Sequence, residues 1–472
     1  MAEASSRETR WQLRTTERRM LLIVGDLLAG IMATIGALAL WSRFDYLTLS
    51  DEFVRARAGW FVLLPVIWLL LLINSYDVRR SANWAETVRN VLMAAAFGTI
   101  LYLSIYFFRT APGSLPRRGP FYFLVLVVGL TMSWRYIYVR IFTSPAFLRR
   151  VLIVGAGSSG VELLKILQGL NPSPFYVVGM IDDDESKHGM VLDGVKVLGN
   201  SAKIESIIRE EDVSDIVVAI LGQMNGEMFQ ALLDAQERYV EIIRMPVLYE
   251  ELLGRVPIHH LESDWLLRSF VDEVRVSSLY LLAKRILDLL FAIVGLILLG
   301  LVFPWVSLAI LIESGSPILY TQTRLGQGGR MYELVKFRTM RQDAESDGLA
   351  HWTDEGDPRM TRLGRLLRKV HIDEFPQFIN VLKGDMSMVG PRPERPELVK
   401  NLERQVPFYR ARLLAKPGIG GWAQVNYGKG GSVEGSAEKL EFDLYYIKHR
   451  SFFLDIWIIL RSIGAALGFR GV

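Results

Sequence analysis

The stretch HIDEFPQFINVLKGDMSMVGPRPE, residues 371–394, places two adjacent carboxylates just ahead of a proline. If Asp373 is the N-cap of a short helix, Glu374 and Pro376 fall in its first turn, and Gly384 is a natural C′ residue. The free N–H groups and the dipole of such a helix start attract phosphate. Adjacent residues on a helix diverge by about 100°, so the two carboxylates do not share one role. The pattern predicts a nucleophile beside a metal ligand, with plain helix capping as the alternative.

Arginines accompany this acid pair. Arg392 lies between Pro391 and Pro393, which fix the backbone on both sides and aim a planar guanidinium suited to phosphate. For each arginine, the alternative is a side chain that faces water or lipid. The candidates for phosphate binding are Arg338 in KFRTM, Arg362, Arg368 and Arg392.

A glycine-rich segment, KPGIGGWAQVNYGKGG at 416–431, follows the acid pair. Glycines let a backbone approach a nucleotide or sugar closely, so the segment is a candidate for substrate contact. The alternative is a cluster of turns around a packed Trp422.

The apolar residues of the chain are gathered in blocks. The 472 residues are 51% hydrophobic, with a mean hydropathy of +0.25, which is typical of a membrane protein with large water-exposed parts. Four blocks come first, at 20–41, 60–73, 91–108 and 121–142, and each is near the length of a membrane span. Arginines precede the first block and lie in or after the fourth, which predicts that both ends of this four-helix unit are cytoplasmic. They are Arg7, Arg10, Arg14, Arg18, Arg19, Arg135, Arg140, Arg149 and Arg150.

Charge and cysteine content exclude several classes of function. A net charge of +4 and the absence of nucleic-acid-reading motifs favour an anionic membrane surface and phosphate ligands over DNA or RNA. The absence of cysteine excludes disulfides, thiolate zinc sites and a cysteine nucleophile. The long polar start, MAEASSRETRWQLRTTERR, is typical of a cytoplasmic tail rather than a secretory signal.

A globular pattern follows the fourth block. VLIVGAGSSG at 151–160 indicates a strand, a glycine turn and a helix start. Further strands at 176–184, 215–220 and 240–246 alternate with helical stretches, which predicts a small doubly wound α/β domain of the Rossmann type.

The glycine turn of this domain is a candidate nucleotide loop. Gly155, Gly157 and Gly160 form GxGxxG, and Asp182 stands where an acidic residue meets a ribose hydroxyl. A catalytic reductase domain would also need a Tyr-xxx-Lys base, and the pair with that spacing, Tyr332 and Lys336, lies beyond the next apolar block. A regulatory or structural nucleotide fold is therefore favoured.

A fifth apolar block carries no charge from Leu289 to Ile312. A straight helix of that length covers about 36 Å, enough to cross a bilayer. However, both flanks are basic, with Lys284 and Arg285 before the block and further basic residues after it, so both should lie on the cytoplasmic side. Pro304 disrupts the helix near its middle. These features predict a re-entrant helix at about 284–313 that enters the membrane and returns.

The motifs KFRTM, DPRMTRLGRLLRK, IDEFPQFINVLKGDMSMVGPRPE and KPGIGGWAQV, in that order, resemble the bacterial sugar transferase family, the monotopic polyprenyl-phosphate phosphoglycosyl transferases. With four membrane helices and a Rossmann-like domain in front, the chain is similar to the long members that start exopolysaccharide, capsule or O-antigen synthesis. The resemblance implies four parts: a transmembrane domain at 1–148, a Rossmann-like domain at 149–258, a linker at 259–279 and a mixed α/β catalytic domain at 280–472.

The resemblance also implies a reaction. Asp373 would be the nucleophile and Glu374 the Mg²⁺ ligand, with Arg368 and Arg392 handling phosphate. A UDP-sugar would lose UMP to give a phosphosugar ester on Asp373, and undecaprenyl phosphate would then take up the sugar phosphate. The expected place is the bacterial inner membrane, as a multi-pass protein with both globular domains in the cytoplasm.

Two alternatives differ in class. One is a membrane-bound NAD-dependent nucleotide-sugar dehydratase or epimerase, which would need the missing Tyr-Lys base and would leave residues 280–472 unexplained. The other is a membrane scaffold that senses a nucleotide through its glycine loop. The transferred sugar and the oligomeric state, including a homo-oligomer, stay open at this stage.

Overall fold

The computed structural model describes residues 15–44, 55, 61–76, 84–108, 118–142, 148–170, 173, 175–260, 276–341, 344, 357–427 and 432–466. Residues 1–14 of the predicted tail and most of the predicted linker lie outside these residues, and the tail's last residues, 15–19, belong to the first helix. The chain divides into two compact units, Met1–Leu248 and Tyr249–Val472. The first unit holds a helical part and an α/β part, and each is described separately.

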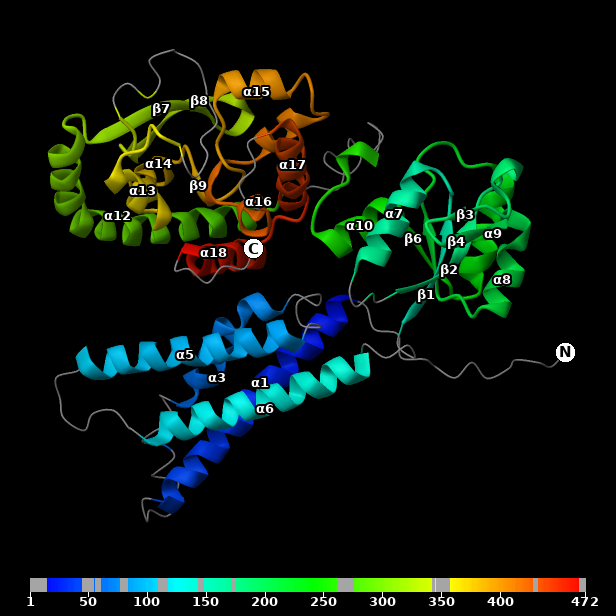
Figure 1. Ribbon diagram of the computed structural model, residues 1–472, viewed down its shortest axis with the longest axis horizontal. Coiled ribbons are helices and arrows are strands. Elements are labelled where there is room, and N and C mark those ends of the chain that lie inside the picture. Colours follow the sequence, from blue (N-terminus) through cyan, green and yellow to red (C-terminus); the bar gives the residue numbers. More distant parts are fainter. Residues whose placement is uncertain are drawn as a thin grey trace. The chain divides into compact units, whose positions relative to one another are not determined.

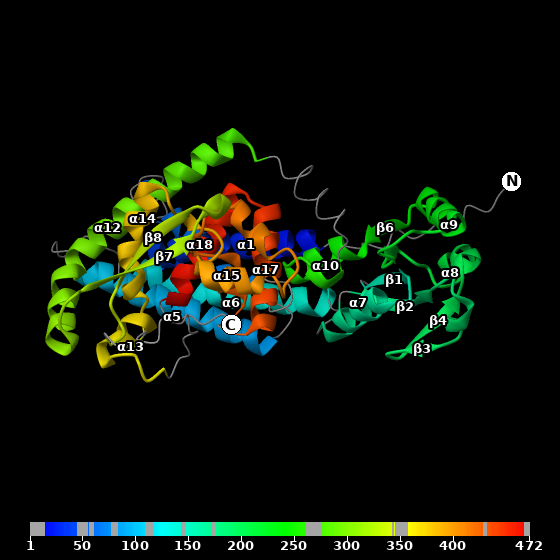
Figure 2. The same ribbon diagram turned by 90° about the horizontal axis from the view of Figure 1, so that it is seen from above.

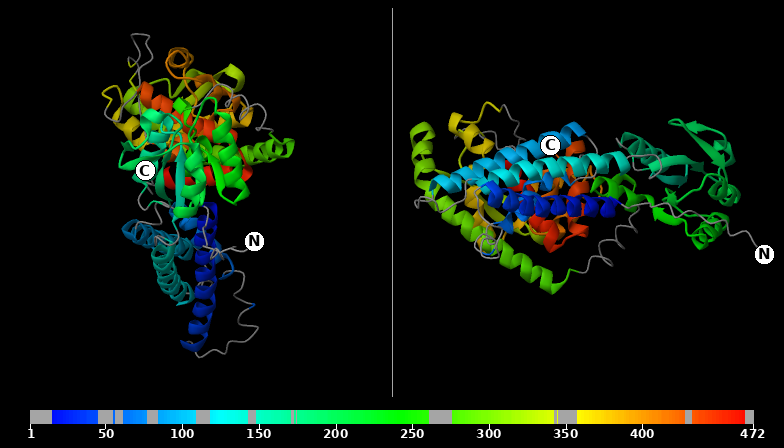
Figure 3. Two further views of the ribbon diagram at one scale, coloured as in Figure 1. Left: turned by 90° about the vertical axis from the view of Figure 1, so that its right-hand side faces the viewer. Right: turned by 90° about the horizontal axis from the view of Figure 1, so that it is seen from below.

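The helical part consists of α1 (Thr15–Phe44), α3 (Leu63–Leu71) with the short η1 (Ile73–Ser75), α5 (Trp84–Phe108) and α6 (Arg118–Phe142). Helices α1 and α6 run side by side (Figures 1 and 3). In the described part of the chain, three helices are long and apolar enough to cross a bilayer: Glu17–Phe44, Arg118–Ile141 and Ser278–Ser314. The second predicted span contains α3, whose nine residues are fewer than the roughly 20 that cross a bilayer alone.

A buried ion pair joins α1 to α6. Arg135 Nη2 lies 2.7 Å from Asp26 Oδ2, and both side chains are fully shielded by the helices. Charged groups are expensive in an apolar medium unless they are paired, so this contact fixes the rotation of the two helices about their axes.

The α/β part contains a six-stranded sheet in the order β3-β4-β2-β1-β5-β6. The predicted strands are confirmed as β1 (Arg149–Val154), β2 (Phe175–Ile181), β5 (Asp215–Val218) and β6 (Glu241–Arg244), which pair in parallel. Helices α8 (Ile204–Glu210) and α9 (Gly226–Glu237) pack on one face through a common apolar cluster, and α7 (Ser158–Gly169) lies on the other side (Figure 1). Short η3 (Glu185–Lys187) and η4 (Ser201–Lys203) complete it, and α10 (Met245–Leu253) follows β6.

Two edge strands were missed from the sequence. β3 (Val191–Leu192) and β4 (Val195–Gly199) form an antiparallel hairpin. Its turn residues Asp193 and Gly194 both have positive φ, 43° and 83°, as the primed hairpin turns require. The Asp-Gly pair was the available signal.

The second unit begins within α10 and continues with η5 (Ile258–His260) and α12 (Ser278–Ser314). An antiparallel hairpin follows, made of β7 (Leu319–Leu325), η7 (Gln327–Gly329) and β8 (Met331–Phe337). Next come α13 (Arg362–Lys369), η8 (Ile372–Gln377), α14 (Phe378–Lys383), β9 (Ser387–Val389), α15 (Pro396–Leu402) and η9 (Tyr409–Leu414). The chain closes with β10 (Gly418–Gly420), α16 (Trp422–Asn426), α17 (Val433–Lys448) and α18 (Phe452–Ala466).

Helix α12 is continuous through Pro304 but bends sharply part of the way along its length (Figures 1 and 2). Near its start, Lys284 Nζ donates to the carbonyl of Val389 at 3.1 Å. Near its end, the Glu313 carboxylate accepts the amides of Arg362 and Leu363, which start α13. A straight helix of this length would extend about 55 Å. The bend instead returns both ends to one folded unit.

We expect Gly160→Ala to weaken the α/β part selectively. A Cβ at position 160 would lie 1.9 Å from the carbonyl oxygen of Gly155, whereas a Cβ at Gly157 would meet no atom within 4 Å. The clash should lower the free energy of local opening around β1 by about 1–3 kcal/mol. Hydrogen exchange of the β1 and β2 amides measures this opening. Gly157→Ala is the matched control, and equal protection in both variants would contradict the close-packing role of Gly160.

Candidate active site

The predicted acid pair lies on η8, which leads directly into α14. The predicted N-cap role of Asp373 is wrong: helix η8 begins after His371, whose φ of 56° is left-handed, and no side chain caps it. Asp373 and Glu374 are instead its second and third residues, and both are buried. The predicted end is confirmed, since Gly384 adopts a left-handed φ of 95° just after α14.

The Glu374 carboxylate is held by two cations from different elements. Its Oε1 accepts from Nζ of Lys336, a residue of β8, at 3.1 Å and from Arg392 Nη2 at 2.9 Å. Burial alone would raise the pKa of Glu374, but the charges of Lys336 and Arg392 outweigh it and hold that pKa well below its usual range. Glu374 is therefore ionised at neutral pH, and among the described residues no hydrogen bond to its Oε2 is found.

Asp373 has the opposite electrostatic environment. Burial and the neighbouring charge of Glu374 raise its pKa, and the charges of Lys336, Arg368 and Arg392 oppose that rise. No hydrogen bond to its carboxylate is found among the residues that the structure describes. The Asp373 carboxylate thus faces cations without a fixed hydrogen bond from the described residues.

The four arginines predicted for phosphate binding fall into two groups. Arg392 is 47% exposed while it binds Glu374, so it can also face a ligand. Arg368 lies near enough to Asp373 for its charge to oppose the rise in the Asp373 pKa. The Arg368 Nε donates to Thr339 Oγ1 at 2.9 Å. Arg338 is buried and donates to Ser314 and Gly315, which end α12, and the Arg362 side chain is exposed on α13. The fold thus brings Arg368 and Arg392 to the acid pair but uses Arg338 to close a turn.

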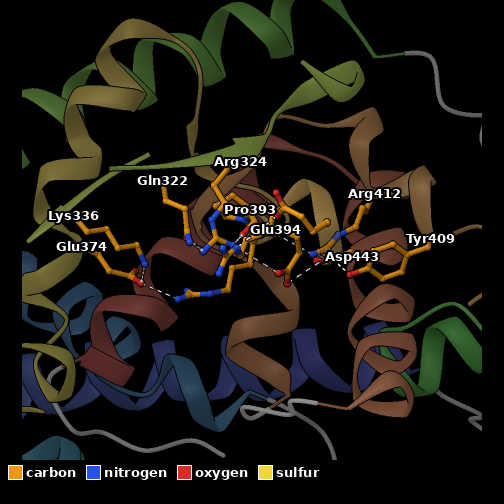
Figure 4. Close-up of polar contacts among 12 residues, drawn as sticks. Gln322, Arg324, Lys336, Glu374, Pro393, Glu394, Tyr409, Arg412 and Asp443 are labelled. Carbon is orange, nitrogen blue, oxygen red and sulfur yellow. Dashed lines mark hydrogen bonds and ion pairs between the residues drawn. The ribbon is translucent and has the colours of Figure 1, made fainter. Parts of the chain in front are cut away.

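A buried network behind Arg392 was not predicted. Arg324 Nη1 donates to the Pro393 carbonyl at 3.0 Å, and Arg412 Nη2 donates to the Arg392 carbonyl at 3.0 Å and to Asp443 Oδ2 at 2.8 Å. Figure 4 shows Lys336 and Glu374 at one end of this network and Tyr409 at the other. Its members come from β7, η9, α17 and the Pro-Arg-Pro loop. Because the carbonyls of Arg392 and of the following Pro393 are both held, the backbone at Arg392 is fixed.

The glycine-rich segment serves packing in its described part. β9 and β10 pair in parallel, and a Cβ at Gly418 would lie 2.1 Å from the amide nitrogen of Gly390. Trp422 stacks on Tyr445 and donates from Nε1 to the Gly254 carbonyl at 2.6 Å. These contacts match the turn cluster around a packed tryptophan, while residues 428–431 lie outside the described residues.

The glycine turn of the α/β part is engaged with its own acidic residue. Gly155 has a φ of 107°, and Asp182 Oδ2 accepts from the amide of Ala156 at 2.7 Å and from Lys187 Nζ at 3.0 Å. Burial alone would raise the pKa of Asp182, but backbone amides and Lys187 together lower it. In this arrangement, Asp182 neutralises Lys187 and braces the turn.

Tyr332 and Lys336, the pair with the spacing of a reductase base, lie on β8 in the second unit. The Tyr332 hydroxyl is buried without a hydrogen-bond partner, and Lys336 binds Glu374. Neither residue belongs to the α/β part. Tyr332 and Lys336 therefore cannot be the catalytic base that an NAD-dependent dehydratase or epimerase would need in the α/β part.

The acid pair fits Mg²⁺ only together with a phosphate ligand. In the described part of the chain, no group of three or more His, Cys, Asp and Glu side chains could hold a metal ion. Mg²⁺ commonly takes one or two carboxylates, several waters and substrate phosphates. The Glu374 carboxylate would meet that requirement only with a diphosphate that supplies the remaining oxygens.

Comparison with known proteins places these features in context. Residues 279–468 match the model of the bacterial sugar transferase family, and residues 72–246 match that of a CoA-binding domain. The UDP-N-acetylgalactosamine-undecaprenyl-phosphate N-acetylgalactosaminephosphotransferase of Aeromonas hydrophila is 38% identical over 255 residues, 54% of this chain and 59% of that protein. The undecaprenyl-phosphate glucose phosphotransferase of Komagataeibacter xylinus is 29% identical over 463 residues, 94% of this chain and 83% of that protein.

A further relative matches a smaller share of this chain. The UDP-glucose:undecaprenyl-phosphate glucose-1-phosphate transferase of Caulobacter vibrioides is 40% identical over 188 residues, 39% of this chain and 70% of that protein. The names of these relatives share undecaprenyl phosphate, although they contain different sugars.

We expect Arg412→Met to destabilise the second unit strongly. The Arg412 side chain is 5% exposed and that of Asp443 is 2% exposed, so removing the cation leaves a buried carboxylate without its charged partner. Breaking such a pair costs about 3–5 kcal/mol. Hydrogen exchange of the amides in η9 and α17 reports the loss.

Arg410→Met is the matched control, because Arg410 lies on the same η9 with a side chain that is 71% exposed. Its effect should stay within about 0.5 kcal/mol. If both variants lost equal protection, the pair of Arg412 and Asp443 would not be the stabilising contact.

Proposed function

The chain belongs to the bacterial sugar transferase family, and we propose that it transfers a sugar 1-phosphate from a UDP-sugar to undecaprenyl phosphate. The products are UMP and an undecaprenyl-diphosphate-linked sugar, the first membrane-bound intermediate of exopolysaccharide, capsule or O-antigen synthesis. The observation that carries the proposal is the buried pair of Asp373 and Glu374, in which Lys336 and Arg392 both bind the Glu374 carboxylate.

Different surroundings support different roles for the two carboxylates, since Lys336 and Arg392 both bind Glu374. Asp373, whose carboxylate has no hydrogen bond among the described residues, attacks the phosphorus that carries the sugar. The bond from this phosphorus to the UMP oxygen breaks, UMP leaves, and a phosphosugar ester on Asp373 results. An oxygen of undecaprenyl phosphate then attacks the same phosphorus and releases the Asp373 carboxylate.

The cations allow a negatively charged donor to approach two carboxylates. Arg392 binds Glu374 and remains half exposed, so its guanidinium can also pair with a donor phosphate. Arg368 lies close to Asp373 and can bind the transferred phosphate. A Mg²⁺ ion held by Glu374 Oε2 and the diphosphate would supply further positive charge at this place.

The proposed setting is the bacterial inner membrane, with the second unit on the cytoplasmic side. Its support is the bend of α12 and the attachment of both helix ends to one folded unit. A helix with that shape enters the cytoplasmic leaflet and returns. Its outward side chains Leu290, Ile297, Leu301 and Trp305 are exposed and apolar, as lipid contact requires. Such seating brings the acid pair near the headgroups, where undecaprenyl phosphate is available.

We expect Asp373→Asn to abolish UMP release while the protein stays folded. The amide has nearly the same shape as the carboxylate but is a poor nucleophile, so turnover should fall by about a thousandfold or more. The measurement is UMP release by the purified full chain with undecaprenyl phosphate, Mg²⁺ and a panel of UDP-sugars. Glu397→Gln, at a side chain that is 67% exposed, is the control and should retain full activity.

Glu374→Gln belongs to the same series and should weaken activity and the response to Mg²⁺ together. Turnover of Asp373→Asn within about tenfold of the wild type would show that Asp373 is not the nucleophile. An unchanged Mg²⁺ titration in Glu374→Gln would remove that residue as the ligand.

The re-entrant path of α12 predicts that both of its flanks are cytoplasmic. The chain has no cysteine, so single cysteines at the exposed positions Ser278 and Met331 test it directly. In intact cells, a membrane-impermeant thiol reagent should label neither position, and both should react once the cells are opened. A cysteine at Ser114, between the third and fourth apolar blocks, is the control for labelling from outside. Labelling of Met331→Cys in intact cells would show a full span and overturn the path.

A further inference from the structure

Three polar side chains follow one another along a single face at the start of α12. Tyr280, Lys284 and Asp288 are spaced four residues apart, which places them in one row on a helix. Asp288 is 4% exposed. The rest of the helix is strongly apolar and long enough to cross a bilayer. Buried charge in such a helix is costly unless it makes specific contacts, so the contacts of this row are informative.

Asp288 binds the strand that leads to Arg392. Its Oδ1 accepts from Ser387 Oγ at 2.9 Å and from the amide of Met388 at 2.9 Å. Both bonds go to the same carboxylate oxygen. Asp288 therefore holds the first two residues of β9 against α12.

Lys284 binds the end of the same strand. Its Nζ donates to the Val389 carbonyl at 3.1 Å, to Tyr446 Oη at 3.1 Å and to Asp455 Oδ2 at 3.1 Å. Tyr280 donates to Asp455 Oδ2 at 2.9 Å, which completes the row. Because Asp455 is fully buried, α12, α17 and α18 meet at one polar centre beside β9.

The path from β9 to the acid pair is short and stiff. Gly390 donates its amide to the Gly420 carbonyl at 2.9 Å, and a Cβ at position 390 would lie 2.1 Å from the Lys416 carbonyl oxygen. Pro391 follows with a fixed φ, and then Arg392 reaches Glu374 at 2.9 Å. A shift of β9 along α12 would therefore be carried to the Arg392 guanidinium with little relaxation between them.

A neighbouring residue of α12 holds the other side of the site. Arg285 donates to the carbonyls of Val381 and Leu382, each at 2.8 Å, at the end of α14. Helix α14 continues directly from η8, which carries the acid pair. One short segment of α12 thus fastens both the element after the acid pair and the strand before Arg392.

We propose that Asp288 and Lys284 are positioning residues of the transfer reaction: they set the place of β9 and, through it, the distance between Arg392 and Glu374. The inference rests on the proposed function, and it makes α12 part of the frame of the site in addition to a membrane anchor. A purely structural role would instead affect the amount of folded protein and leave the activity of each folded molecule unchanged.

The test compares two substitutions of Asp288 in the purified full chain. Asp288→Ala removes both hydrogen bonds and should lower kcat/KM for UMP release by about ten- to a hundredfold, mainly through kcat, as small misplacements of a catalytic group do. Asp288→Asn retains the oxygen that accepts both bonds, so it should stay within about threefold of the wild type. Leu290→Ala, at a side chain of α12 that is 58% exposed, is the control for changes in the helix itself.

A double-mutant cycle with Arg392→Lys identifies the route of the effect. If Asp288 acts through Arg392, Asp288→Ala should lower kcat/KM less than about threefold in the Arg392→Lys background, because the guanidinium that Asp288 positions is already lost. If Asp288→Ala does not fold, Ser387→Ala removes one of the same bonds from the strand side. It should lower kcat/KM by about three- to tenfold in the wild-type background alone.

The outcomes separate the inference from the function on which it rests. Equal losses in both backgrounds, or an Asp288→Ala variant with wild-type kcat/KM, would overturn the positioning role. Loss of activity in Asp288→Asn equal to that in Asp288→Ala would also overturn it, because the hydrogen bonds would not be the cause. A wild-type chain that releases no UMP with any UDP-sugar would instead contradict the proposed function.

Discussion

Two adjacent carboxylates buried in one short helix repel each other, and the second unit is arranged around that constraint. Asp373 and Glu374 can both lie out of water only because cations surround them. Lys336 comes from β8, Arg368 from α13 and Arg392 from the loop after β9, so the elements that frame the site are also those that neutralise it. The packing of these elements is thus also what balances the charge of the acid pair.

The same constraint explains why the supporting network extends so far from the pair. Arg392 keeps a fixed direction toward Glu374 because Arg412 holds its carbonyl and Arg324 holds that of the following Pro393. Arg412 needs Asp443 as a counter-charge, and that residue lies on α17. Because each buried charge requires a buried partner, the network extends from Arg392 through Arg412 to Asp443 in the core of the unit.

Much of this arrangement could be predicted from the sequence, because its signals are local. The strands of the α/β part follow from apolar runs next to glycine turns, and the left-handed Gly384 follows from the end of a helical pattern. The start of η8 could not be predicted, because a left-handed His371 replaces the side-chain cap that Asp373 was expected to provide. Lys336 was missed as a partner of Glu374 because 38 residues separate them, and only the packing of β8 against η8 brings them together. Arg412 and Asp443 were missed for the same reason.

The bend in α12, with both helix ends fastened to one folded unit, also limits how that unit can move. A domain tethered at one end can rotate about its tether and sample many orientations. Two attachments at opposite ends of a helix leave no such hinge, so any tilt of the domain would have to tilt the helix as well. A lipid layer that holds α12 would resist that tilt over the whole apolar length of the helix. The acid pair would then keep a constant depth and orientation relative to the lipid layer as the molecule diffuses laterally.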